Sequence, residues 1–143
     1  MTEIVRVRLN SVSDDEVDRK STRLRKAAEV AVGRALEDAG YRYHVPEELH
    51  AGIIGFTKYG ERYPELWLSK ERRVHPLQFG SGILNSVIGH CSIVYHLTGP
   101  QILLTKGSMF EVADLQLTMC RSRLMVLCRY DDPLVVEVEV VQR

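Results

Sequence analysis

The chain has 143 residues, a length that fits a single domain with a sizeable buried core. Its 19 basic and 19 acidic residues balance, which argues against a nucleic-acid or membrane surface as the partner. Hydrophobic residues make up 45% of the chain, which excludes a disordered protein, and no apolar run reaches the roughly 18 residues of a membrane span.

The three cysteines are an odd number and show no CxxC spacing; they are Cys91, Cys120 and Cys128. This pattern favours a reduced, cytoplasmic setting over a disulfide framework. Each cysteine lies in an apolar segment, so all three are predicted to be buried and inert. The first ten residues also lack the basic and then apolar layout of a signal peptide.

The chain begins with a predicted strand and a helix. Apolar and charged residues alternate over residues 3–9, which is typical of a strand with one buried face. Ser13 and Glu16 have the spacing of a capping box, and Ser21 or Thr22 offers a second helix start. Apolar residues then recur at spacings of three and four, which predicts one buried helix face.

Gly40 is expected to end this helix, because glycine adopts the left-handed conformation found after many helices. Residues 41–50 are predicted to form a loop. Residues 51–56 are apolar without alternation, as expected for a strand covered on both faces. The polar stretch 58–73 has room for one short helix over residues 65–70.

The stretch from residue 85 to residue 108 organises the rest of the chain. Residues 83–97 are apolar almost all round, which predicts a helix that is buried or lies in an interface. A Gly-Pro turn follows, and then a short apolar strand at 101–105. Gly107 and Ser108 turn that strand into the next helix, and α/β proteins commonly place a nucleophile or an anion site at such a turn.

Another helix is predicted over residues 109–121 and another buried strand over 124–128. Residues 130–133 have turn composition, and residues 134–141 are predicted to form an edge strand with glutamates on its exposed face. Apolar strands joined by helices predict an α/β layered domain. Its mixed, mostly parallel five-stranded sheet would be packed by helices, and the whole chain would be a single domain.

Residues 75–117 resemble the N-terminal half of the β-ketoacyl synthases, which have the thiolase fold. The shared order is a proline and an aromatic residue, an Asn-Ser pair, Gly-His before an apolar helix, and Leu-x-Gly-Pro. A strand and the nucleophile turn then follow. The matching residues are Pro76, Phe79, Asn85, Ser86, Gly89, His90, Ser92, Leu97, Gly99 and Pro100. Weaker matches extend the resemblance to roughly residues 22 to 130.

The resemblance places the family's catalytic cysteine on Ser108, directly after Gly107. A thiolate attacks thioesters readily, whereas a serine needs an adjacent base. The family takes its two catalytic histidines from the C-terminal half of the fold, and this sequence reaches only Arg143. We therefore do not expect a single copy of this chain to be an ordinary ketosynthase.

His90 has two interpretations. One is a hydrogen-bonded histidine that packs its helix, and the other is a base for Ser108. A metal site at His90, Cys91 and His96 is not expected, because adjacent helical residues point to different sides and no further ligand cluster completes a site. No metal and no other cofactor are therefore predicted.

The resemblance implies that the chain is a non-catalytic or altered partner in polyketide or fatty-acid-type synthesis. In the family, two subunits pair antiparallel through the strand that corresponds to residues 101–105. A half-fold also exposes surface that its other half covers. We therefore expect a homodimer, or a heterodimer with a full or complementary ketosynthase subunit, and an acyl carrier protein as a further partner.

Two alternative functions are open, one as an enzyme and one as a binding module. The chain is an acyltransferase-type enzyme if Ser108 accepts an acyl group, with the amides after Gly107 stabilising an oxyanion. It is a binding module without chemistry if basic residues meet a phosphopantetheine arm and aromatic residues line an acyl cleft. The residues in question are Arg72, Arg73, Phe79, Gly107 and Phe110.

Overall fold

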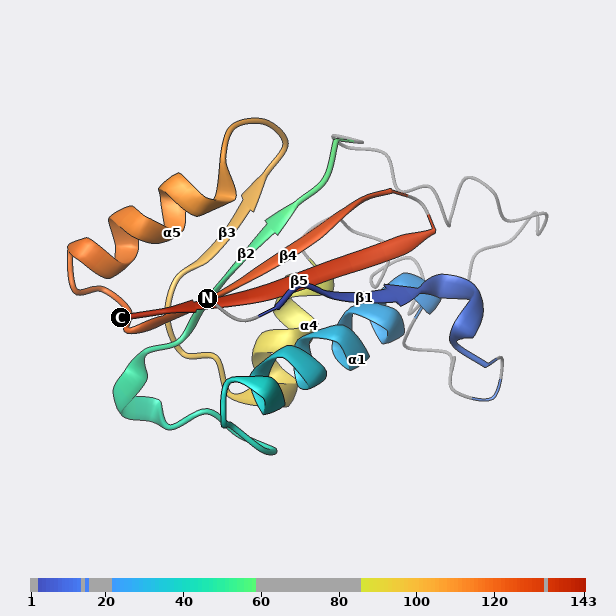
Figure 1. Cartoon of the computed structure of the whole chain (residues 1–143), viewed down its shortest axis with the longest axis horizontal. Helices are drawn as coiled ribbons and strands as arrows, with labels where there is room; N and C mark the ends of the chain where they lie inside the picture. The colour runs from blue at the N-terminus through green and yellow to red at the C-terminus, as the bar shows by residue number, and fades with distance from the viewer. Residues whose placement is uncertain (1–2, 14, 16–21, 59–85, 133) are drawn as a thin grey trace.

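The computed structural model describes residues 3–13, 15, 22–58, 86–132 and 134–143 (Figure 1). The predicted helix at 65–70 lies outside these residues, and so does Glu16 of the capping box. Within them, helices pack on both faces of one five-stranded sheet. The strands are β1 (Val5–Arg8), β2 (Gly52–Phe56), β3 (Gln101–Leu104), β4 (Leu124–Asp132) and β5 (Val135–Gln142). The α-helices are α1 (Arg23–Asp38), α4 (Ser86–Tyr95) and α5 (Met109–Thr118).

The sheet has the strand order β1-β5-β4-β2-β3. β4, β2 and β3 pair in parallel, whereas β5 is antiparallel to both of its neighbours, β4 and β1. Four of the five strands therefore run in one direction. This arrangement confirms the predicted mixed, mostly parallel sheet.

The prediction that residues 134–141 form an edge strand is wrong, because β5 lies between β4 and β1. The exposed glutamates that suggested an edge, Glu137 and Glu139, lie on a sheet face that α5 only partly covers. The predicted turn at residues 130–133 is also wrong in part. β4 continues to Asp132, and the register shift in its pairing with β5 lies between Arg129 and Asp132.

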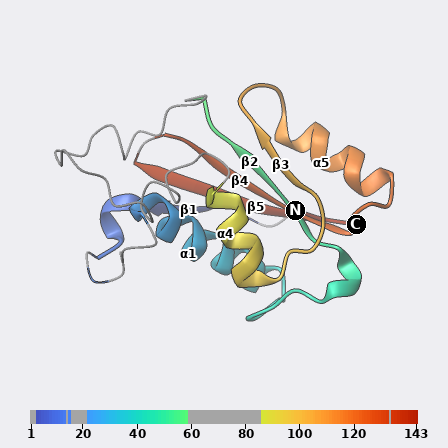
Figure 2. The same cartoon turned by 180° about the vertical axis from the view of Figure 1, so that it is seen from behind.

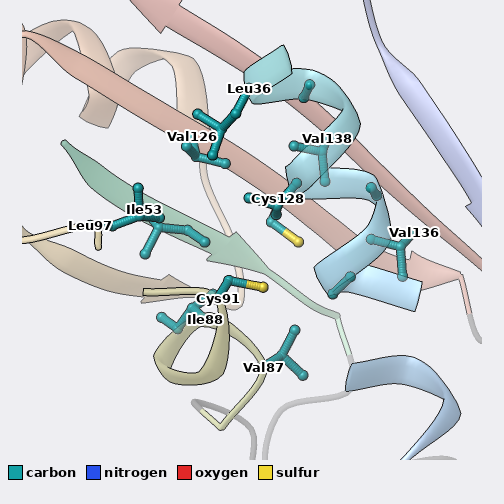
Figure 3. Close-up of a cluster of buried hydrophobic side chains, with 14 of the residues drawn as sticks. Leu36, Ile53, Val87, Ile88, Cys91, Leu97, Val126, Cys128, Val136 and Val138 are labelled. Carbon is teal, nitrogen blue, oxygen red and sulfur yellow. The ribbon is translucent and has the colours of Figure 1, made fainter. Parts of the chain in front are cut away.

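The two faces of the sheet form separate cores. α1 and α4 lie side by side on one face, as seen from behind in Figure 2, and Figure 3 shows the side chains that they bury against β2, β4 and β5. α5 covers the other face through Met109, Ala113 and Leu117, which pack on Ile54 and Leu127. Successive residues of a strand therefore pack into opposite cores, because side chains along a strand alternate between the two faces of the sheet.

Local sequence signals explain the ends of α1. Thr22 caps the helix, because its side chain accepts a hydrogen bond of 3.2 Å from the amide of Arg25. At the other end Gly40 has a φ of +97°, and the amide of Tyr41 donates to the carbonyl of Leu36. Gly40 therefore ends the helix as predicted, in the position that follows the C-cap residue Ala39.

The Gly-Pro turn connects α4 to β3 and is tied to the start of β2. The amide of Gly99 donates to the carbonyl of Ala51 at 2.8 Å, and the amide of Ile53 donates to the carbonyl of Pro100 at 2.9 Å. A Cβ atom at residue 99 would overlap the carbonyl oxygen of His50. Only glycine allows the two backbones to approach this closely.

Candidate functional site

The turn between β3 and α5 is the candidate site. Gly107 has a φ of +91° and Ser108 is extended, with a φ of −109° and a ψ of 119°. The hydroxyl of Ser108 accepts a hydrogen bond of 3.2 Å from the amide of Glu111 and thereby caps the first turn of α5. Ser108 is thus an N-cap residue at the position where the resemblance places a nucleophile.

The surroundings of the turn are open. Ser108 is half-buried, Gly107 and Phe110 are exposed, and a Cβ atom at Gly107 would have no neighbour within 4 Å. Within the described residues, the Ser108 hydroxyl has no partner besides the Glu111 amide. A ligand therefore has room to reach the hydroxyl, but no described side chain is hydrogen-bonded to it as a base.

His90 lies on the other side of the sheet. α4 packs with α1 in one core, whereas α5 packs in the other. The Nε2 atom of His90 is 3.1 Å from Oε1 of Glu29 on α1, and the other oxygen of Glu29 is 2.8 Å from Nζ of Lys26. The structure thus joins His90 to α1 and does not bring it to Ser108.

The pKa of His90 is lowered from its ordinary value of 6.5, because the ring is partly buried and the positive charge of Arg25 faces it. The Glu29 carboxylate opposes this effect only in part. The imidazole is therefore neutral at pH 7, and its Nε2–H donates to Glu29. This geometry is that of a packing histidine, the first of its two interpretations.

A small pocket of about 140 Å³ adjoins the first turn of α5, between Met109 and the strands β4 and β5. Arg129 lines it together with Glu137 and Glu139. Glu137 pairs with Arg6 at 3.3 Å, and Glu139 has no side-chain partner among the described residues.

Arg129 also lies over the ring of Phe56, 4.7 Å from its centre. Arg129 was not among the site residues predicted from the sequence, since only the strand register reveals it. Arg129 is the cross-strand partner of both Phe56 and Glu137, which places all three on the α5 face of the sheet.

The remaining predicted ligand-binding residues, Arg72, Arg73 and Phe79, lie outside the described residues. Phe110 is close in sequence to Ser108 and is 47% exposed. No group of three or more metal-binding side chains is present among the residues that the structure describes. His96, part of the rejected metal site, stacks on His44 with ring centres 4.1 Å apart.

The cysteines differ from one another in their exposure. Cys91 and Cys128 are fully buried, and burial raises the pKa of both thiols, that of Cys128 to about 12 (Figure 3). Cys120 is exposed, so the prediction of burial is wrong for this residue. It follows the end of α5, where apolar neighbours in the sequence face solvent rather than the core.

Comparisons with known proteins point to a fold. No protein-family profile matches the sequence, and no curated protein matches it. Among solved structures, the chain is similar to "The ishigamide ketosynthase/chain length factor", with a TM-score of 0.61 and 17% sequence identity. The match covers 90% of this chain and 46% of that one.

This likeness confirms the predicted α/β, thiolase-like fold, and the chain spans about half the length of the structure that it matches. Among the described residues, no helix is long and apolar enough to cross a membrane. The turn with its capping serine thus lies within a thiolase-like fold.

Proposed function

We propose that the chain is a ketosynthase-like partner subunit in polyketide- or fatty-acid-type biosynthesis. It acts by pairing with a second ketosynthase-like subunit, either another copy of itself or a complementary chain. The fold likeness to a ketosynthase/chain length factor supports the biosynthetic class. The open edge of β3 is the observation that carries the proposed pairing.

Within the part of the chain that the structure describes, β3 lies at the end of the sheet and pairs only with β2. Within the β2 pairing, the carbonyls of Pro100 and Leu104 accept from the amides of Ile53 and Thr57. Because backbone groups alternate along a strand, the N–H and C=O groups of Gln101 and Leu103 point away from β2. No other described strand pairs with these groups, and such an edge suits a strand from another subunit.

The exposed side of α5 adds apolar surface that suits a protein partner. Phe110, Leu115 and Met119 are 47%, 54% and 50% exposed. Leu115 on α5 and Met119 at its C-cap are four residues apart, and together they offer apolar surface to a protein partner. An acyl carrier protein is a further expected partner, which would deliver a thioester to the assembled pair.

The pairing is tested with the substitution Gln101→Pro. Proline removes the outward-facing amide at the first residue of β3 and leaves the bonds to β2 in place. We expect sedimentation equilibrium to show a dimer for the wild type and a dissociation constant raised about tenfold or more for the variant. The same comparison applies to a heterodimer with a ketosynthase-like subunit that is encoded beside this chain.

Gln101→Ala is the matched control, because alanine keeps the amide while removing the same exposed side chain. It should associate as the wild type does. If the wild type is a strict monomer both alone and with that second subunit, the proposed pairing is wrong. Equal weakening by proline and by alanine would instead assign the effect to the glutamine side chain.

A second candidate is an enzyme of the acyltransferase class with Ser108 as the acyl acceptor. The open space around Gly107 and the amides at the start of α5 support it, because they offer access and hydrogen-bond donors to an oxyanion. In this reaction the Ser108 oxygen bonds to the acyl carbon, the thioester C–S bond breaks, and the thiol leaves with the serine proton.

Intact-mass measurement after incubation with acyl thioesters tests this candidate. A single acyl adduct on the wild type that disappears in Ser108→Ala is expected if Ser108 reacts. Ser108→Cys should form the adduct faster, since a thiolate is the better nucleophile. Absence of an adduct in both the wild type and Ser108→Cys excludes the enzyme and leaves the partner subunit.

A further inference from the structure

A second pocket lies at the opposite end of α5 from Ser108. It has a volume of about 410 Å³ and is formed where the end of α5 meets β5 and the loop before β2. Its polar side chains are Glu48, His50, Cys120, Ser122, Arg123 and Arg143. Neither the ketosynthase resemblance nor the proposed pairing assigns a role to this pocket.

The backbone fixes Cys120 at this pocket. After the last turn of α5, the amide of Cys120 donates to the carbonyl of Leu117 at 3.1 Å, and that of Arg121 donates to the carbonyl of Gln116 at 3.1 Å. This pair of bonds requires a left-handed residue, and Cys120 has a φ of +57°. The helix end thus holds the cysteine in place, with its side chain exposed at the pocket.

Arg143 brings a positive charge to the thiol. Its amide donates to the carbonyl of Arg123 at 3.0 Å, which fixes the end of β5 against the strand before it. Its Nη1 atom donates to the carbonyl of Leu117 at 2.7 Å and lies 3.5 Å from the sulfur of Cys120. The guanidinium charge therefore lies directly beside the sulfur, where it attracts an approaching anion.

Arg123 adds a second cation to the same pocket. Its amide donates to the carbonyl of Leu49 at 2.9 Å, but its guanidinium has no partner among the described residues. The lining of the pocket holds two guanidinium groups and one side-chain carboxylate, that of Glu48. The pocket therefore attracts anions, and its volume suits a small molecule with carboxylates.

We propose that this pocket is a modification site, at which Cys120 undergoes thiol exchange with a low-molecular-weight disulfide that carries carboxylates. The Cys120 thiolate attacks one sulfur of the disulfide, so a new S–S bond forms and the old one breaks. The other half leaves as a thiolate and takes up a proton. Cys120 is oxidised and the disulfide is reduced, while Arg123 and Arg143 hold the carboxylates.

The test compares an anionic and a neutral aromatic disulfide on the native chain: 5,5′-dithiobis(2-nitrobenzoate) and 2,2′-dithiodipyridine. Each should react quickly with one thiol, because Cys91 and Cys128 are buried and have raised pKa values. Cys120→Ser should abolish this fast phase. Oxidised glutathione should then give one mixed disulfide at Cys120, seen by peptide mass spectrometry.

Arg123→Gln is the decisive variant. It should slow the anionic reagent about tenfold and leave the neutral reagent within about twofold, because it removes charge and not the thiol. Arg121→Gln removes an exposed charge that does not line the pocket and serves as the matched control. Raised salt should slow only the anionic reagent.

Two results would overturn the proposal. One is a fast phase that persists in Cys120→Ser. The other is an Arg123→Gln variant that reacts with both reagents as the wild type does. Circular dichroism confirms that each variant compared is folded, because an unfolded Cys120→Ser chain would expose Cys91 and Cys128 and give a fast phase of its own.

Discussion

Gly99 has a hydrogen atom where alanine has a methyl group, and this difference decides whether the Gly-Pro turn can pack against the segment before β2. A Cβ atom there would meet the carbonyl of His50, and both segments are held by backbone hydrogen bonds. Gly99→Ala is therefore expected to lower the free energy of unfolding by about 3 kcal/mol, since neither backbone has room to move. Urea denaturation followed by circular dichroism measures this change.

Gly89 provides the control for Gly99. It lies in α4, and a Cβ atom there would have no neighbour within 4 Å. Gly89→Ala should raise the stability by about 0.5–1 kcal/mol, because alanine loses less backbone entropy in a helix. A similar gain in stability in both variants would show that the contact with His50 does not determine the effect at Gly99.

Among the elements, α4 is joined to α1 by a pH-dependent contact. The pKa of His90 is lowered in the folded chain by burial and by Arg25, whereas the unfolded chain keeps the ordinary value of 6.5. Between the pKa of the folded state and pH 6.5, the unfolded state therefore binds more protons than the folded state. The free energy of unfolding falls as the pH is lowered through this range. Well above pH 6.5 the imidazole is neutral in both states, so His90 no longer makes the free energy of unfolding depend on pH.

We expect the urea midpoint of the wild type to fall more steeply than that of His90→Gln between pH 7 and about pH 5. Glutamine keeps a donor for Glu29 but does not titrate. Equal slopes in the two proteins would show that His90 does not titrate differently in the folded and unfolded states. The carboxylates titrate in both proteins, so their effect cancels in the comparison.

The elements that the sequence predicts correctly are those whose signals are local. Thr22 caps α1 and Gly40 ends it, because a hydroxyl and a missing Cβ act within one turn. The apolar run of β2 likewise reports burial directly, whereas the apolar run of β3 does not, because β3 lies at the end of the sheet and is only partly buried. The family resemblance added the position of Ser108, and the structure shows that this serine caps a helix.

The errors concern contacts between distant segments. Glu137 and Glu139 alternate in the same way on an edge strand and on an interior strand with one open face, so the place of β5 depends on its pairing with β1. Arg129 enters the site only through its register with Phe56 and Glu137. Cys120 was predicted to be buried from its apolar neighbours, but the left-handed turn after α5 exposes it.

For the whole molecule, the position of β5 has a consequence for the order of folding. β5 pairs with β4 on one side and with β1 on the other, and Val136, Val138 and Val140 fill the core beneath α1. During synthesis on the ribosome, β5 emerges about a hundred residues after α1. The apolar stripe of α1 therefore lacks this packing partner until β5 has been synthesised. Such a high contact order predicts slow folding, with a nascent chain that depends on chaperones until β5 arrives.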